Sequence, residues 1–335
     1  MAAHYSEDVR RPLLAALLAL ATVLVASGPA QAAKNRWIQK RAPLNIAHQG
    51  GEDEFPSNTL YAFRKALRVG ADMLELDIGV TKDGKVIVMH DTTVDGKTNG
   101  TGNVSSLTLR QIKSLDAAYW FAPKAESHYT HDLSASAYRF RGIATGAKRP
   151  PRGFERSDFR VPTLREVLRA FPRTPINIEI KGRTPQEDVS EYIRNAEVLA
   201  KLLRHTKRRD IIVVSFQQPA VDRFHELVPR IGVAPGIAGA AAWILGDGSP
   251  GPGVVAFQVP ITFTGIVITN AANVARAHRA GYAWQNWFSG DDSDSAATWR
   301  GLIEMCVDGT MTSHPRAYER VLRAHARPKS CRAQL

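Results

Sequence analysis

Short hydrophobic runs alternate with helical patterns along the chain from residue 44 onward. Runs of this length between helical segments predict strands. The predicted strands are Leu44–His48, Met73–Ile78, Val86–His90, Ile176–Ile180, Ile211–Phe216, Ile231–Val233, Val254–Val259, Ile266–Ile268 and a last run near Thr310–Met311.

Helix start signals lie between several of these runs. Thr163–Glu166 and Thr184–Glu187 both have the capping-box pattern, in which a threonine is followed three residues later by glutamate. A further helix is predicted from Asn58 or Thr59 to Gly70. It has one hydrophobic stripe that suits packing on a sheet, formed by Leu60, Phe63, Ala66 and Leu67.

The alternation predicts an α/β protein with a (β/α)8 barrel. One continuous series of strands over about 270 residues suits such a barrel better than two domains. We therefore expect a single domain over residues 33–335. Because the runs outnumber the strands of a barrel, the sixth and seventh strands are left unassigned.

An insertion at about residues 122–160 interrupts the alternation. The segment is rich in arginine and lysine, with tyrosine and phenylalanine between them. We expect a long loop or small subdomain above the end of the barrel that carries the active site. A solvated basic loop is the alternative.

Residues 1–32 have the pattern of a cleavable signal peptide. A pair of arginines precedes a hydrophobic stretch from Leu13 to Ala26, and Ala30-Gln-Ala32 offers a cleavage site. The stretch is too short to span a bilayer comfortably. We expect a mature protein beginning near Ala33 that is secreted, periplasmic or associated with the cell envelope; the arginine pair leaves twin-arginine export open.

The composition is that of a globular protein, with 44% hydrophobic and 23% charged residues in 335. A formal net charge of +12 favours anionic partners such as phosphate esters, lipid head groups or cell-wall polymers. We expect a small-molecule substrate, with transient contact to an anionic membrane or cell-wall surface as an option, and no nucleic acid partner. The two cysteines, Cys306 and Cys331, could form one structural disulfide in an exported protein or remain free thiols.

Polar side chains recur on one face of the predicted strands. Alternate residues of a strand share a face, so Glu75 and Asp77 lie on one side with Leu76 on the other. The same parity groups Glu179 with Lys181. Two adjacent carboxylates on one strand face need a cation.

The ends of these strands suggest a shared polar centre. His48 and His90 end their runs, as Lys181 ends its own, and in a barrel these C-terminal ends face the reaction site. Carboxylate ligands favour Mg²⁺ or Ca²⁺ over Zn²⁺. Two histidines free of the metal could act as acid and base, which fits phosphoryl chemistry.

These residues resemble those of the glycerophosphodiester phosphodiesterase family. The resemblance covers roughly residues 44 to 315 as an ordered series of motifs. They are His48-Gln-Gly-Gly51, Pro56-Ser-Asn-Thr59, Glu75-Leu-Asp77, Thr81-Lys-Asp-Gly84, Val88-Met-His-Asp91, Gly100-Thr-Gly102, Leu107-Thr-Leu109, Val161-Pro-Thr-Leu164, Asn177-Ile-Glu-Ile-Lys181, Ser215-Phe216 and Val307-Asp-Gly309.

The resemblance implies a role for each site residue. His48 and His90 would be the acid/base pair, and Lys181 would help to hold the phosphate. One divalent cation, Mg²⁺ or Ca²⁺, would bind to Glu75, Asp77 and Glu179. The implied reaction is hydrolysis of glycerophosphodiesters to glycerol phosphate and an alcohol, in which either histidine could be the acid.

The chain departs from the family pattern at several positions, and the departure at Gln49 affects the substrate side of the site. Gln49 stands where the family has arginine in His-Arg-Gly, which removes a bidentate phosphate donor and its charge. Ser57 replaces the glutamate of Pro-Glu-Asn-Thr, which we expect to be a structural adjustment rather than a loss of catalysis. Trp287 occupies the place of the family's tryptophan near the last strand, and we predict that Gln49 and Trp287 contact substrate.

Two other functions are compatible with the same residues. A related phospholipase or sphingomyelinase-D-like enzyme would act on intact lipids, and a non-catalytic protein would bind a phosphate-rich polymer. The acidic run Glu52–Glu54 could touch a cation but is expected to be a solvated loop. The other histidines are expected at the surface or in loops: His128, His131, His205, His225, His278, His314 and His325.

Overall fold

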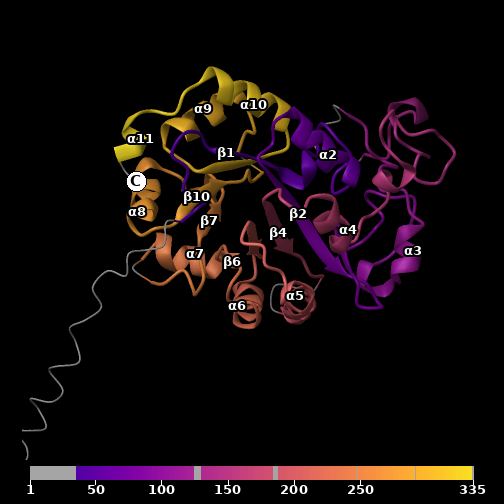
Figure 1. The fold of residues 1–335 in the computed structure, drawn as a ribbon, viewed down its shortest axis with the longest axis horizontal. Coiled ribbons are helices and arrows are strands. Elements are labelled where there is room, and N and C mark those ends of the chain that lie inside the picture. The colour runs from indigo at the N-terminus through magenta and orange to yellow at the C-terminus, as the bar shows by residue number, and fades with distance from the viewer. Residues whose placement is uncertain (1–34, 124–129, 184–187, 247, 291, 334–335) are drawn as a thin grey trace, which may run out of the picture. The chain divides into compact units, whose positions relative to one another are not determined.

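Parallel strands form a nearly closed eight-stranded barrel, with helices around its outside (Figure 1). The computed structural model describes residues 35–123, 130–183, 188–246, 248–290 and 292–333. In ring order the strands are β6 (Gly232–Val233), β5 (Ile211–Val214), β4 (Ile176–Ile180), β2 (Met73–Val80), β1 (Leu44–Ala47), β11 (Gly309–Thr312), β10 (Ala283–Asn286) and β7 (Ala256–Val259). A parallel bridge between Val233 and Val254 links the two ends of this series. The predicted (β/α)8 fold is confirmed.

The helices begin where the sequence signals predict. Thr59 caps α2, and Thr163 forms a complete capping box with Glu166 at the start of α4. The predicted box at Thr184–Glu187 and the predicted signal segment 1–32 lie outside the described residues. The helices are α2 (Leu60–Val69), α3 (Leu109–Lys113), α4 (Leu164–Ala170), α5 (Ser190–Leu203), α6 (Gln218–Leu227), α7 (Ile237–Ile244), α8 (Ala271–Arg279), α9 (Ala296–Glu304), α10 (Pro315–Ala324) and α11 (Ser330–Ala333). Within the described ranges, none of these helices has the length and hydrophobicity to cross a membrane.

Strand β2 divides its side chains between two environments. Leu74, Leu76 and Ile78 are fully buried in the hydrophobic layer between the barrel and its helices. Met73 packs in a different cluster together with residues of β1, β5, β7 and β11. Glu75 and Asp77 share the parity of Met73, so the strand directs both carboxylates into the barrel.

Two predicted runs form strands outside the barrel, and one barrel strand was not predicted. The run at Val86–His90 forms β3 (Val86–Val88), which pairs antiparallel with β2 and is not part of the ring. Ile266–Ile268 supplies β9 (Ile266–Val267) of a separate hairpin with β8 (Thr262–Phe263). The missed barrel strand is β10, whose sequence Ala-Trp-Gln-Asn lacks an aliphatic run but continues the series between β7 and β11.

The described part of the insertion packs beside α2 rather than above the end of the barrel (Figure 1). Phe140 and Phe159 are buried against Tyr61 of α2, with ring centroids 5.1 Å and 4.6 Å from the tyrosine ring. Arg141 lies 4.0 Å from the ring of Tyr138. The segment therefore shares a hydrophobic core with α2, which a solvated basic loop would lack.

A disulfide joins Cys306 to Cys331 and ties the C-terminal segment to the end of α9. Nearby, Asp308 is fully buried and accepts hydrogen bonds from the backbone of Gln39 and Trp284, each at 2.8 Å. His278 is buried as well and lies 2.8 Å from the same carboxylate. The surface position expected for His278 is thus wrong, because this histidine is the internal partner of Asp308.

We expect reduction of the disulfide to lower the free energy of unfolding by about 3 kcal/mol, since it releases a loop across 25 residues. Equilibrium urea unfolding with and without reductant measures this change. The double variant Cys306→Ala/Cys331→Ala should unfold identically in both conditions. Equal unfolding of the wild-type protein with and without reductant would contradict the expectation.

Candidate active site

A cavity of about 980 Å³ opens at the C-terminal ends of the barrel strands. Its lining includes the predicted site residues His48, Gln49, Glu75, His90, Glu179, Lys181 and Trp287. Asp77 is the one predicted site residue outside that lining, and it lies fully buried next to Glu75 and Glu179. The barrel therefore brings together residues that are up to 239 positions apart in sequence (His48 to Trp287).

The three carboxylates could hold a metal ion. Asp77 of β2 pairs in register with Glu179 of β4, and Glu75 lies two residues before Asp77. One oxygen from each lies within 4.8 Å of the others. Asp77 Oδ2 accepts a hydrogen bond from Asn58 at 2.9 Å, while Asp77 Oδ1 is buried and accepts none from any described residue.

The charge balance of this cluster favours a cation. Burial and the neighbouring charge of Asp77 raise the pKa of Glu75 to about 8. Burial would also raise the pKa of Asp77, but the positive charges of His90 and Lys181 outweigh it and lower that pKa. A divalent cation would relieve the repulsion between the carboxylates, and oxygen-only ligands suit a hard ion. The donor set thus fits the predicted cofactor.

Lys181 lines the cavity next to two of the three carboxylates. Its Nζ is 2.8 Å from Glu179 Oε1 and 3.4 Å from Asp77 Oδ1. Burial would lower the pKa of this ammonium, but these two carboxylates raise it above its usual value. Lys181 therefore remains charged and can meet an anion in the cavity.

His48 is held by a residue that the sequence interpretation missed. Its Nδ1 lies 2.7 Å from Glu52 Oε1, and its Nε2 lies 3.9 Å from Glu75 Oε2. Burial would lower the pKa of His48, but the carboxylates of Glu52 and Glu75 raise it to about 10. Glu52 was expected in a solvated loop, yet it is 8% exposed. The signal for its role was its spacing four residues after His48.

His90 reaches the site by a different path from the one predicted. Strand β3 runs back along β2, and the backbone of Met89 donates to Asp77 O at 3.0 Å. Because β3 runs antiparallel to β2, His90 lies beside Asp77 although β3 is not a strand of the barrel. Asp91 fixes the imidazole through a 2.8 Å contact with Nδ1, which leaves Nε2 for chemistry.

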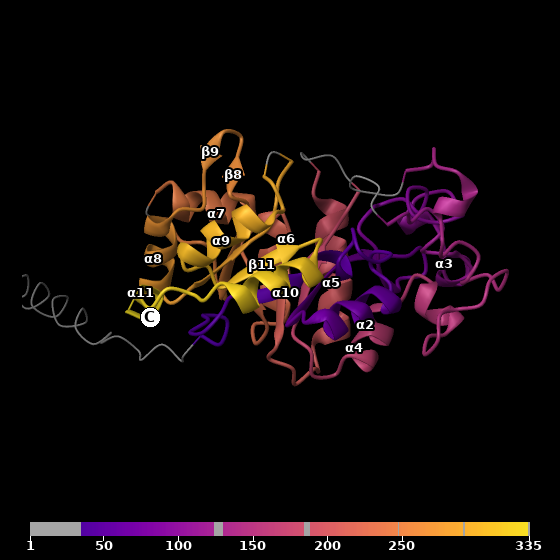
Figure 2. The same ribbon diagram turned by 90° about the horizontal axis from the view of Figure 1, so that it is seen from above.

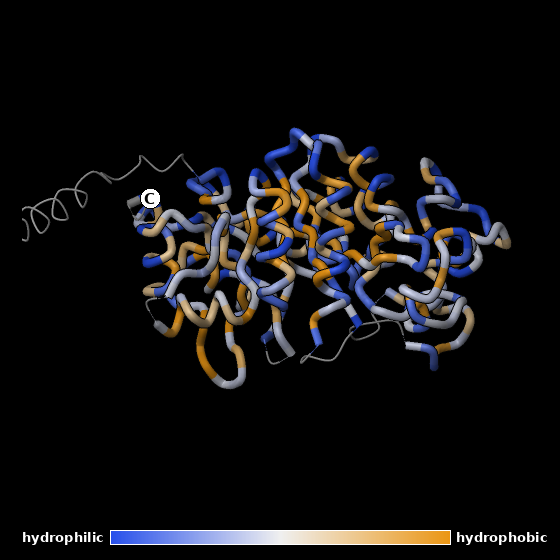
Figure 3. Tube along the Cα trace, turned by 90° about the horizontal axis from the view of Figure 1, so that it is seen from below, coloured by the Kyte–Doolittle hydropathy of each residue, from blue (hydrophilic) through white to orange (hydrophobic). Residues whose placement is uncertain are grey.

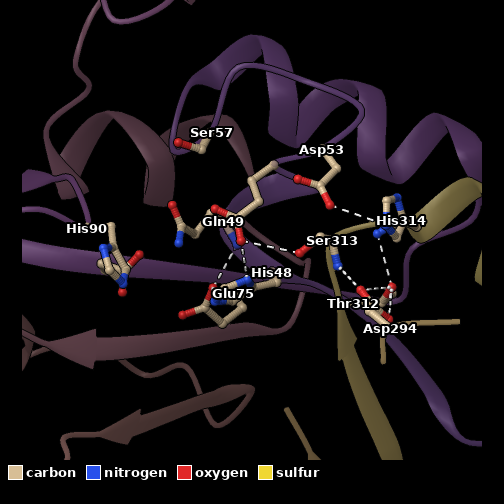
Figure 4. A network of polar contacts seen from close by, with 12 residues as sticks. His48, Gln49, Asp53, Ser57, Glu75, His90, Asp294, Thr312, Ser313 and His314 are labelled. Atoms are coloured by element: carbon tan, nitrogen blue, oxygen red, sulfur yellow. Dashed lines mark hydrogen bonds and ion pairs between the residues drawn. The ribbon is translucent and has the colours of Figure 1, made fainter. Parts of the chain in front are cut away.

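Gln49 and Trp287 both line the cavity, but they are held differently. Gln49 is buried in the left-handed backbone region (φ 49°), and its backbone N–H donates to Glu75 Oε2 at 2.7 Å (Figure 4). Trp287 stacks on Phe216 with centroids 5.4 Å apart and donates from Nε1 to Gln258 O. Gln49 thus supports a proposed metal ligand, while Trp287 contributes an aromatic wall.

A second polar network borders His48 (Figure 4). Ser313 Oγ donates to Glu52 Oε1 at 3.2 Å, and the backbone of Ser313 donates to Asp294 at 2.8 Å. His314 lies 3.2 Å from Asp53. Ser313 and His314 follow β11, Asp294 precedes α9, and Glu52 and Asp53 follow β1, so no spacing in the sequence signals that they meet.

The family model for glycerophosphoryl diester phosphodiesterases matches residues 48–317. The chain belongs to this family. A glycerophosphodiester phosphodiesterase of Bacillus subtilis is 32% identical over 206 residues, which is 60% of this chain and 61% of the relative. A lysophospholipase D of Rattus norvegicus is 34% identical over 170 residues, covering 49% of this chain and 44% of the relative. Both alignments thus cover less than two thirds of the relative.

Solved structures of the family share the fold. A phosphodiesterase from Oleispira antarctica, crystallised in complex with the product sn-glycerol-3-phosphate, superposes with a TM-score of 0.60 at 18% identity. The match covers 84% of this chain and 97% of that structure. At this level of identity the match concerns the barrel and its connections.

Proposed function

We propose that this protein hydrolyses glycerophosphodiesters to glycerol phosphate and an alcohol, with one divalent cation bound to Glu75, Asp77 and Glu179. The observation that carries the proposal is that two carboxylates of the triad line one cavity together with His48 and His90 in a member of this family, and that Asp77 is buried beside them. Mg²⁺ or Ca²⁺ would polarise the phosphate oxygens when bound, which favours attack at phosphorus.

The side chains around the cavity supply the remaining steps. Lys181 stabilises negative charge that develops on the phosphoryl oxygens. One histidine takes the proton from the attacking oxygen, which is the neighbouring glycerol hydroxyl or a water molecule. The other protonates the leaving alcohol oxygen as its bond to phosphorus breaks. Glu52 orients His48 and Asp91 orients His90 for these transfers.

Product identification tests this proposal directly. Purified protein incubated with glycerophosphocholine and Mg²⁺ or Ca²⁺ is expected to release glycerol 3-phosphate and choline in equal amounts. Absence of product from any glycerophosphodiester, or release of choline phosphate instead, would contradict it.

A second substrate class is favoured by the wall of the cavity across from the triad. In the ring order, β6 and β7 lie opposite β2 and β1. The helix after β6 and the hairpin after β7 supply large hydrophobic side chains that line the cavity and are also exposed, and the hairpin projects from the barrel (Figures 2 and 3). They include Ile237, Leu245, Phe263 and Ile266, with exposures of 46%, 65%, 38% and 48%.

We propose that this wall binds the acyl chain of a lysophospholipid while its phosphodiester lies at the triad. Exposed hydrophobic patches of this kind mark binding surfaces, and this one is continuous with the polar site. Glycerophosphocholine has no acyl chain, so such a wall does not increase its binding affinity. Hydrolysis of a lysophospholipid at the head-group bond would release choline and leave lysophosphatidic acid.

Phe263→Ser/Ile266→Ser is expected to lower kcat/KM for lysophosphatidylcholine by about tenfold or more, because each buried methylene contributes about 0.8 kcal/mol. Turnover of glycerophosphocholine should stay within about twofold, since the catalytic groups are untouched. Parallel assays on the two substrates measure the difference.

Val267→Ser is the matched control for this experiment. Val267 lies on the same hairpin and is 58% exposed, but it does not line the cavity. An equal loss on both substrates, or an equal loss from Val267→Ser, would contradict acyl-chain binding by the wall.

We also propose that the protein is exported and works in an oxidising compartment. The Cys306–Cys331 disulfide supports this, because such bonds persist outside the cytosol. The predicted signal peptide in residues 1–32 supports the same location. Sequencing the N terminus of the protein recovered from the medium or cell envelope tests this, and a start near Ala33 is expected.

A further inference from the structure

Lys97 carries a positive charge into the wall of the cavity next to Gln49. The residue is 9% exposed and lines the same cavity as His48 and Glu75. Its Nζ donates to Gln49 Oε1 at 2.8 Å and to Ser57 Oγ at 2.9 Å. Both acceptors are neutral oxygens, and the ammonium also lies close enough to the carboxylates of Glu52 and Asp91 to interact with their charges.

The loop that carries Lys97 is itself fixed. It follows His90, and Val94 N–H donates to Gly102 O at 3.0 Å across its base. Thr98, the neighbour of Lys97, donates from Oγ1 to Val94 O at 2.8 Å. Gly102 N–H donates to Asp95 Oδ1 at 2.8 Å. Lys97 is thus placed by a closed loop and has little freedom to leave the cavity.

Gln49 connects Lys97 to the proposed metal site. An ammonium has no acceptor, so Gln49 must present its amide oxygen to Lys97. Asn58 donates to the same oxygen at 3.3 Å and to Asp77 Oδ2 at 2.9 Å. The backbone N–H of Gln49 donates to Glu75 Oε2 at 2.7 Å. The ammonium therefore has a defined position relative to Glu75 and Asp77.

The two partners of Lys97 are the two positions where this chain departs from the family pattern near His48. The pattern has arginine at position 49 and glutamate at position 57, and this chain has Gln49 and Ser57. Both changes remove a charge. Lys97 contacts both side chains from a separate loop, 48 and 40 residues away in sequence. The positive charge missing from position 49 is thus supplied by Lys97, whose ammonium contacts the side chain at that position.

We propose that Lys97 is a phosphate-binding residue of this site and takes the part of the family's arginine, with Gln49 and Ser57 holding its ammonium in position. The proposal rests on the proposed function, because the ligand of Lys97 would be the phosphate of a glycerophosphodiester or of the glycerol phosphate released from it. An ammonium binds phosphate as a point charge, whereas arginine binds it through a planar fork.

Binding of sn-glycerol 3-phosphate in the presence of Mg²⁺, measured by calorimetry, tests this without requiring turnover. Lys97→Met, which keeps the length and removes the charge, should weaken binding by about 10- to 100-fold. Lys97→Arg should stay within about fivefold of wild type. Gln49→Arg/Lys97→Met restores a cation from the family's own position and should recover most of the affinity.

The control is Lys113→Met, which removes a lysine that is paired with Glu166 at 2.8 Å and does not line the cavity. It should bind glycerol 3-phosphate like wild type. Thermal unfolding of each variant verifies that it is folded. Wild-type affinity in folded Lys97→Met would overturn the proposal, as would failure of both Lys97→Arg and Gln49→Arg/Lys97→Met to bind better than Lys97→Met.

The outcome is separable from that of the proposed function. If the wild-type protein releases no glycerol 3-phosphate from any glycerophosphodiester, but Lys97→Met still loses affinity for glycerol 3-phosphate, the hydrolytic function fails and the role of Lys97 stands. If the wild-type protein hydrolyses glycerophosphocholine and Lys97→Met both binds and turns over normally, the role of Lys97 fails alone.

Discussion

Asp77→Asn is expected to lower kcat/KM for glycerophosphocholine by about 10³-fold or more, because it removes a carboxylate from the proposed metal site. Asp77 is fully buried, and its Oδ1 accepts no hydrogen bond from any residue in the described ranges. Asparagine keeps the shape and the contact with Asn58 but presents a weaker, neutral ligand. Steady-state kinetics at saturating Mg²⁺ or Ca²⁺ measures the loss.

Thermal unfolding separates metal binding from stability in the same variant. A ligand that binds only the folded state raises the unfolding temperature. We expect Mg²⁺ or Ca²⁺ to raise it for the wild-type protein and not for Asp77→Asn. Asp116→Asn is the matched control, because Asp116 is also fully buried but accepts hydrogen bonds from the Ala118 and Gly142 backbone. An equal metal-induced shift in Asp77→Asn and wild type would contradict the assigned site.

His48→Ala and His90→Ala should each reduce kcat by about 10²- to 10⁴-fold, the usual contribution of a positioned proton-transfer group. The double variant should lose much less than the product of the two effects, because the histidines act on one reaction step. Metal-induced stabilisation should persist in both single variants, since neither histidine belongs to the carboxylate triad. Product release under saturating substrate measures the effect on kcat.

His314→Ala provides the control for the histidine experiment. His314 lies close to the same network through Asp53, at 3.2 Å, but it does not line the cavity. Its replacement should change kcat by no more than about threefold. Activity above about a tenth of wild type in either His48→Ala or His90→Ala would show that the acid/base pair is assigned wrongly.

The carboxylate triad could be predicted because its signal is local. Glu75 and Asp77 are two residues apart on one strand, so strand parity alone places both on the inner face. Glu179 has the same parity with Lys181 on a second strand of the same barrel. Each inference used only residues that are close in sequence, because the regular geometry of a strand fixes which side chains share a face.

The rest of the site depends on contacts that sequence spacing does not specify. Val86–His90 has the pattern of a barrel strand, and only its antiparallel return along β2 explains how His90 reaches Asp77. Lys97 gave no signal, because its partners Gln49 and Ser57 belong to a different loop. Strand β10 was missed because its buried positions include two polar residues with tertiary partners: Gln285 accepts a hydrogen bond from Gln258, and Asn286 donates one to Thr269. Tertiary hydrogen bonds decide all three cases.

The most direct test of the central claim is glycerol 3-phosphate release from glycerophosphocholine by protein stripped with a chelator, before and after adding back Mg²⁺ or Ca²⁺. If hydrolysis depends on a metal ion at the triad, the stripped protein should release no glycerol 3-phosphate. Addition of Mg²⁺ or of Ca²⁺ should then restore the full activity. Undiminished release by the stripped protein in excess chelator would contradict the claim.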